Sequence, residues 1–184
     1  MNKSVYILLS RTGTLFSRAI RLATGNEFTH ISFSFDNSLS QMYSFARRNP
    51  YLPFIAGFVH EDIRSGIFGK YPDAPCALYR LEVSEESFAA MRGMIDTFEQ
   101  DYDKYRYSLL GPLLIEMDLP LHREYHFVCS QFVAHLLEKS GALAFPKDSA
   151  LMTPMDFSYL PELEPLYFGT LEHYPFYRSQ GVCY

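Results

Sequence analysis

Cys129 has the clearest capacity for chemistry in this sequence, because it stands where an amphipathic helix is predicted to begin, in FVCSQFVAHLLEKSG. A thiolate, rather than a thiol, attacks a carbonyl carbon, so a nucleophilic cysteine needs a neighbouring base or a positive field. A helix N-terminus supplies part of this, since its dipole favours the anion and its free N–H groups can stabilise an oxyanion. The alternative is a core thiol packed beneath the helix, because free cysteine is among the most buried residue types.

A base for this cysteine has to come from one of the six histidines. His30 stands near the start of FTHISFSFD, the most regular strand pattern of the chain, in which apolar and polar residues alternate. A histidine fixed at a strand start and facing a helix that presents a cysteine has the geometry of papain-like catalysis. His126 precedes the predicted helix and His135 lies nearly two turns along it. His173 would give the papain order of cysteine before histidine, but the residues after it do not continue as an alternating strand.

Three segments in this order, FTHISFSFD, QMYSFARR and FVCSQFVAHLLEKSG, resemble the circularly permuted NlpC-type papain-like superfamily, in particular its YiiX/YaeF-like group. In that group a THV-x-I strand carries the histidine, and a later helix of the pattern CS-[EQ]-[FLV]-V carries the cysteine. The opening segment, SVYILLSRTGTLFSRAIRLATGNEFTH, is similar to the lead-in of the same group. The resemblance implies one α+β papain-like domain over residues 1–184, with a small antiparallel sheet packed against helices and no cofactor.

The resemblance also implies catalytic roles for particular residues. Cys129 would be the nucleophile and His30 the general base, and a third polar residue on the strand after the histidine would orient the imidazole. The corresponding position is Ser44, where relatives often have an acid. Tyr43 and Ser44 face opposite sides of a strand, so only one of them can serve. A serine orients imidazole less strongly than a carboxylate, and Ser44 therefore departs from the pattern of the group.

Weaker candidates for substrate binding surround these residues. Arg47 can bind a substrate carboxylate, alone or with Arg48, or form a solvated strand edge. Tyr43 and Tyr125 either line the site or pack in the core.

Composition excludes several classes of function. The chain has 184 residues, a net charge of −5 and only scattered basic residues, which argues against nucleic acid as a partner. Three cysteines without a CxxC pair and six histidines without HExxH spacing give little support for disulfides or a metal site. The N-terminal apolar run is too short for a signal-peptide core, and no stretch is long enough to span a bilayer. We expect a cytoplasmic protein without integral membrane association, and the oligomeric state stays open.

The predicted elements form a single α+β domain. Residues 4–10 predict a buried strand, and residues 29–36 and 41–48 predict a hairpin around DNSLS. A helix is expected from Thr12 or Thr14 to Gly25, and a longer one from its N-cap Ser84. Further strands are expected in AGFVHEDI, CALYRLEV and PLYFGTL, and a helical segment in YSLLGPLLIEM. The apolar stripe predicted for the first helix is Leu15, Phe16, Ala19, Ile20 and Ala23.

Three hypotheses on function remain open from the sequence. The first is a cysteine peptidase or amidase that cleaves an amide bond in a small peptide-like substrate through a thioester. The wider superfamily suggests cell-wall peptides, and internalised wall fragments or other amides fit a cytoplasmic chain better. The second keeps the fold but acts on lipid-like esters, as relatives of the lecithin:retinol acyltransferase kind do. The third is a non-catalytic binding module, supported mainly by the missing carboxylate at Ser44.

Overall fold

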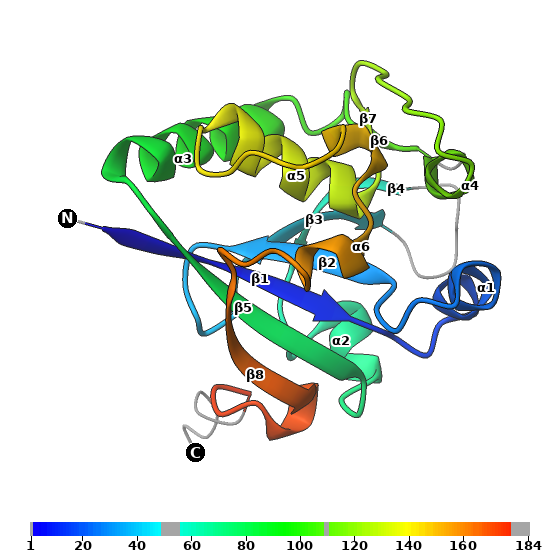
Figure 1. Cartoon of the computed structure of the whole chain (residues 1–184). Coiled ribbons are helices and arrows are strands. Elements are labelled where there is room, and N and C mark those ends of the chain that lie inside the picture. The colour runs from blue at the N-terminus through cyan, green and yellow to red at the C-terminus, as the bar shows by residue number, and fades with distance from the viewer. Residues whose placement is uncertain (1, 49–55, 109–110, 178–184) are drawn as a thin grey trace.

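A six-stranded antiparallel sheet forms the centre of the molecule, with strand order β4-β3-β2-β1-β5-β8 (Figure 1). The computed structural model describes residues 2–48, 56–108 and 111–177, without the side chains of residues 15, 16, 19, 20, 23, 113 and 116. The strands of the sheet are β1 Lys3–Ser10, β2 His30–Ser34, β3 Met42–Arg47, β4 Ala56–Glu61, β5 Pro75–Val83 and β8 Glu164–Thr170. Two further short strands, β6 Arg106–Tyr107 and β7 His126–Phe127, pair in parallel beside it.

Helices cover both faces of the sheet. The longest two, α3 Glu85–Gln100 and α5 Cys129–Lys139, lie on one face, and the short α2 Gly66–Lys70 lies on the other (Figure 1). Two more helices, α1 Leu15–Thr24 and α4 Gly111–Glu116, stand at one end of the molecule (Figure 1). The remaining turns of helix are α6 Pro154–Phe157 and the 3₁₀ segments Ser149–Leu151 and Leu171–His173.

The helix ends follow the capping residues in the sequence. Ser84 precedes α3, and its hydroxyl accepts a hydrogen bond from the Ser87 N–H at 3.1 Å, as predicted for an N-cap. Thr14 caps α1 in the same way, and Gly25 ends that helix with a φ of 70°, the left-handed conformation that glycine adopts without strain. The apolar stripe predicted for α1 lies on side chains outside the described part of the chain.

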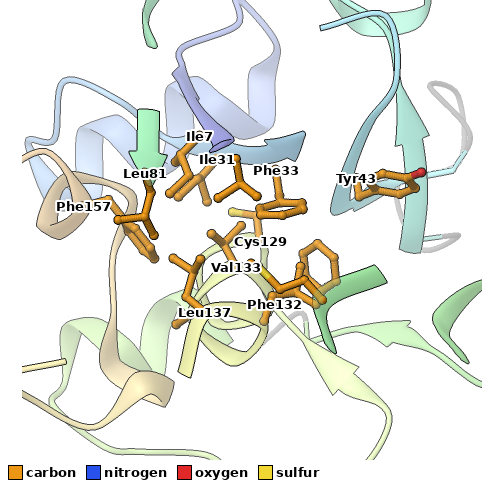
Figure 2. Packing of buried hydrophobic residues seen from close by; sticks show 14 of the residues in the cluster. Ile7, Ile31, Phe33, Tyr43, Leu81, Cys129, Phe132, Val133, Leu137 and Phe157 are labelled. Atoms are coloured by element: carbon orange, nitrogen blue, oxygen red, sulfur yellow. The ribbon is translucent and has the colours of Figure 1, made fainter. Parts of the chain in front are cut away.

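The alternation predicted for residues 29–36 is confirmed in β2. Ile31 and Phe33 are fully buried in the core between the sheet and the helices α3 and α5. On that face the rings of Phe45, Phe58 and Phe132 contact one another, and Figure 2 shows Phe132, Val133 and Leu137 of α5 packed in this cluster. His30 and the serines of β2 lie on the opposite face. Because the apolar side chains of β2 pack against those of α5 in one cluster, the two elements hold a fixed position relative to each other.

Arg48, which follows β3, binds the segment that leads into β6. Its guanidinium donates hydrogen bonds to the carbonyl oxygens of Phe58, Tyr102 and Tyr105, and it stacks on the Tyr102 ring with its carbon 3.8 Å from the centroid. Gly57 of β4 passes so close to the Tyr105 carbonyl that no β-carbon fits there. The sheet edge and β6, which carries Tyr107, are therefore held together.

Within the described residues, no helix is both long and apolar enough to cross a membrane.

Candidate active site

A cavity of about 660 Å³ opens where β2 begins and α5 begins, and both His30 and Cys129 line it. Much of its wall is apolar, with Phe45, Ala56, Val59, Ile67 and Phe68 among the lining residues. A run of hydroxyl groups, from Thr12, Thr14, Ser17 and Thr29, forms another side of it. The cavity thus offers an apolar chamber that ends on a thiol and an imidazole.

Cys129 is the first residue of α5, as the sequence predicted. The residue before it, Val128, has no side-chain capping bond, so the free N–H groups of the first turn depend on other partners. The Gln131 side chain accepts a hydrogen bond from the Val128 N–H at 3.1 Å and donates one to the Ala150 carbonyl at 2.8 Å. These bonds fix the backbone that presents the Cys129 thiol, whose residue is 6% exposed. Figure 2 shows Cys129 among the apolar side chains, near Ile31 and Phe33 of β2 and Val133 of α5.

His30 lies between Cys129 and a carboxylate from another strand. Its Nε2 atom lies 3.0 and 3.2 Å from the two carboxylate oxygens of Glu61, the last residue of β4. Ser32 donates a further hydrogen bond to Glu61 Oε2 at 2.6 Å, which holds the carboxylate toward the ring. Because Nε2 is engaged by Glu61, Nδ1 is the ring nitrogen left to face Cys129, which lines the same cavity and contributes to the raised pKa of His30.

Ser44 also approaches His30, from β3. Its hydroxyl lies 3.3 Å from His30 Nε2 and donates a hydrogen bond to the Ile31 carbonyl at 3.1 Å. The structure therefore brings His30, Cys129 and Ser44 together, as the sequence predicted. Ser44 supplies a neutral contact to the ring, whereas Glu61 supplies the negative charge.

The charge state of His30 follows from these neighbours. Burial of the ring disfavours the imidazolium, but the Glu61 charge and the hydrogen bonds to Cys129 and Glu61 outweigh it. Together they raise the pKa of His30 to about 10. The His30 side chain is only 15% exposed, so solvent screens this interaction weakly. At neutral pH the ring is therefore an imidazolium, with a carboxylate on one side and the Cys129 sulfur on the other.

Tyr107 of β6 lines the same cavity. Burial, together with the charge of Cys129, raises the pKa of its phenol well above the usual value. The phenol therefore keeps its proton and can donate a hydrogen bond beside the cysteine.

The residues predicted to bind substrate have three different environments. Arg47 lines the cavity and is partly buried. Tyr43 is 3% exposed and lies on the opposite face of β3 from Ser44, with its ring stacked on Phe58; it does not line the cavity. Tyr125 is exposed and contacts the Tyr105 ring, also away from the cavity.

Glu61 is the site residue that sequence reasoning missed. It stands in AGFVHED, where an acid ends an otherwise apolar strand. In the sheet, Val59 pairs with Ser44 and Glu61 pairs with Met42, so Ser44 and Glu61 share the face that carries His30. An acid at the end of the strand after the Ser44 strand is the signal that could have identified it.

Comparison with protein-family models, with curated proteins and with solved structures gives no match to this chain. Among the described residues, no group of three or more histidine, cysteine, aspartate or glutamate side chains is arranged to hold a metal ion. The geometry of the cavity is therefore the basis on which we infer a function.

Proposed function

We propose that this protein is a thiol hydrolase of the permuted papain-like kind, a cysteine peptidase or amidase with Cys129 as nucleophile. The observation that carries the proposal is the position of His30, between the Cys129 thiol and the Glu61 carboxylate in a lined cavity. A nucleophile, a base in contact with it and a group that orients the base are the three parts that covalent acyl transfer needs. A core cysteine has no need of such partners.

In the proposed reaction the Cys129 thiolate attacks the carbonyl carbon of an amide and forms a tetrahedral intermediate. The Cys129 N–H at the start of α5 and the Tyr107 hydroxyl, which lines the same cavity, are the donors that we assign to the oxyanion. The C–N bond then breaks, and the His30 imidazolium gives its proton to the leaving amine, which leaves a thioester. Water attacks the thioester carbon and returns a proton to His30, and the acid product and the thiolate are released.

Glu61 acts on this sequence through His30. It fixes the ring orientation through Nε2 and stabilises the imidazolium that the leaving-group step consumes. The hypothesis of a non-catalytic module depended on the missing carboxylate at Ser44. Because Glu61 supplies a carboxylate to the same ring nitrogen, we favour the enzyme over the module.

The apolar walls favour one alternative within the same chemistry. A chamber lined by Phe45, Val59 and Phe68 fits an acyl chain as well as an apolar side chain of a peptide. An acyltransferase or thioesterase that acts on lipid-like esters would form the same thioester at Cys129. A long-chain ester that traps a stable acyl-enzyme, while peptide amides do not react, would favour this alternative.

Site-resolved alkylation tests the proposal. Wild-type protein and His30→Ala are treated with iodoacetamide from pH 5 to pH 10, and the modification of each cysteine is read by mass spectrometry. We expect Cys129 to react well below pH 8 and much faster than Cys76, and this low-pH reaction to be lost in His30→Ala. The proposal is wrong if Cys129 reacts no faster than Cys76, or if its pH profile is unchanged without His30. Circular dichroism of the variant checks that it is folded.

A further inference from the structure

A second cavity, of about 170 Å³, adjoins the first and is lined by three arginines. Arg11 follows β1, and Arg18 and Arg21 lie one turn apart on α1. Liquid water takes about 30 Å³ per molecule, so the cavity has room for several waters or for one phosphate group. We call the hollow formed by Arg11, Arg18, Arg21 and Tyr71 the arginine cavity.

The three guanidinium groups lack partners in the described part of the chain, where no carboxylate or carbonyl oxygen hydrogen-bonds to any of them. Of the described residues that line the cavity, only Asp73 is acidic, and it forms no ion pair with them. Elsewhere Arg64 pairs with Asp62 at 3.1 Å and Arg80 pairs with Glu164. The hollow is therefore bordered by three cations, two exposed and one partly buried, in a chain with a net charge of −5.

The wall of the cavity brings the backbone close to a ring. At Gly13, a β-carbon would lie 2.8 Å from Tyr71 Cε1, so any larger residue would force that ring to move. Glycine at this position lets the Tyr71 ring pack directly against the backbone, and both residues line the cavity. Three arginine side chains around one hollow suit a group with several anionic oxygens, such as a phosphate.

The arginine cavity lies next to the catalytic cavity. Thr12 and Ser17 line both of them. The Ser17 hydroxyl lies 2.7 Å from the Thr29 hydroxyl, and Thr29 directly precedes His30. The two cavities are therefore neighbours on either side of Thr12 and Ser17, close enough that one extended substrate could contact both.

We propose that the arginine cavity binds a phosphate group of the substrate whose carbonyl reaches Cys129. This proposal has two halves. The binding half, that the arginines bind phosphate, is independent of turnover. The catalytic half, that the bound molecule is a substrate of Cys129, rests on the proposed hydrolase function. The phosphate belongs to a phospholipid headgroup or to a water-soluble phosphate monoester, two sources with the same recognition chemistry. The arginine cavity would thus select substrates, amides or esters, that carry a phosphate group at the end away from the scissile bond.

The binding half is tested on Cys129→Ala, which cannot turn over. Inorganic phosphate and phosphoserine are titrated into it by calorimetry, and then into the same chain with Arg18→Gln and Arg21→Gln. The matched control carries Arg106→Gln and Arg123→Gln, which remove two exposed arginines that do not line the arginine cavity. We expect the first double variant to weaken binding at least tenfold and the control to change it less than twofold. Absence of binding, or equal affinity in both double variants, overturns the proposal.

The source of the phosphate is tested with vesicles. Cys129→Ala is sedimented with phosphatidylcholine vesicles that contain, or lack, phosphatidic acid. Binding that needs phosphatidic acid and is lost with Arg18→Gln and Arg21→Gln assigns the site to a lipid headgroup. Binding of phosphoserine without vesicle binding assigns it to a soluble monoester. Binding to vesicles that is equal in both double variants contradicts a phosphate site at these arginines.

The catalytic half is tested with N-butanoyl-serine amide and its O-phosphate as paired substrates. We expect a kcat/KM at least tenfold higher for the phosphate, and loss of this preference in Arg18→Gln with Arg21→Gln through a higher KM. Equal kcat/KM values for the two substrates overturn the link between the cavities. If neither substrate is hydrolysed while phosphoserine binds as expected, the hydrolase proposal fails and the phosphate site stands.

Discussion

The surroundings of Cys76 and Cys129 differ far more than their burial does. Cys76 of β5 is 2% exposed and lies in the cluster of Leu8, Leu78 and Leu171 on the α2 side of the sheet. Burial alone raises the pKa of its thiol to about 12. Cys129 is 6% exposed, but it adjoins a cavity, an imidazolium and a helix N-terminus. Neighbouring charge, rather than accessibility alone, separates a thiol that packs from one that can react.

The largest expected effect comes from exchanging each cysteine for alanine. Cys129→Ala removes the nucleophile, and we expect the rate of amide or ester hydrolysis to fall at least about 1,000-fold. Cys76→Ala removes only a buried sulfur and should leave the rate unchanged, with a loss of unfolding free energy on the order of 1 kcal/mol. Steady-state kinetics and urea denaturation measure the two effects. Similar losses of rate in both variants would mean that the contrast between the two thiols does not determine function.

Removing the charge of Glu61 should have the next largest effect. Glu61→Gln keeps the shape of the side chain but takes the negative charge away from His30 Nε2, so the pKa of His30 should fall. We expect a rate loss on the order of 100-fold or more, by analogy with other triads that lose their acid. The pH–rate profile measures the rate loss and the fall in the pKa of His30. The alkaline limb of the profile, which is expected near pH 10 in wild type, should move to lower pH in the variant. An unchanged alkaline limb would contradict the role of Glu61.

Protein stability should also depend on pH through His30. The folded-state pKa of His30, about 10, lies above the ordinary histidine value of 6.5, so its contribution to stability is fully present below pH 6.5. That contribution should decline as the pH rises from 6.5 toward 10. Urea denaturation of wild type and His30→Gln at several pH values isolates it, since other titrating groups are common to both. A stability difference that is constant between pH 6 and pH 10 would contradict the ion pair.

Ser44→Ala should have the smallest effect on the rate. Its hydroxyl makes a neutral contact to His30 and a hydrogen bond to the Ile31 carbonyl, each worth on the order of 1 kcal/mol. We expect about a fivefold loss of rate and little change in the alkaline limb. A loss as large as that of Glu61→Gln would assign the orienting role to Ser44, as the sequence predicted.

The sequence predicted those elements whose signals lie within a few neighbouring residues. The caps at Thr14 and Ser84, the alternation of β2 and the start of α5 at Cys129 depend on residues a few positions apart, and all were predicted. The five-residue helix α2 was not predicted, because so short a segment carries no period. Glu61 and the arginine cavity were missed because they depend on which strands and turns become neighbours. Sheet register and the placing of α1 beside the end of β1 are tertiary properties.

The two approaches to His30, by Ser44 from β3 and by Glu61 from β4, have an evolutionary consequence. One imidazole nitrogen within reach of two strands gives a lineage two positions at which the acid can be encoded. A pattern that requires the acid on the strand next to the histidine would classify this chain as a degenerate homologue. Among relatives we expect positions 44 and 61 to covary, with an acid at one position and a small or neutral residue at the other. If the acid can move between these two positions, the residue that orients the histidine would say less about common ancestry than the cysteine and the histidine do.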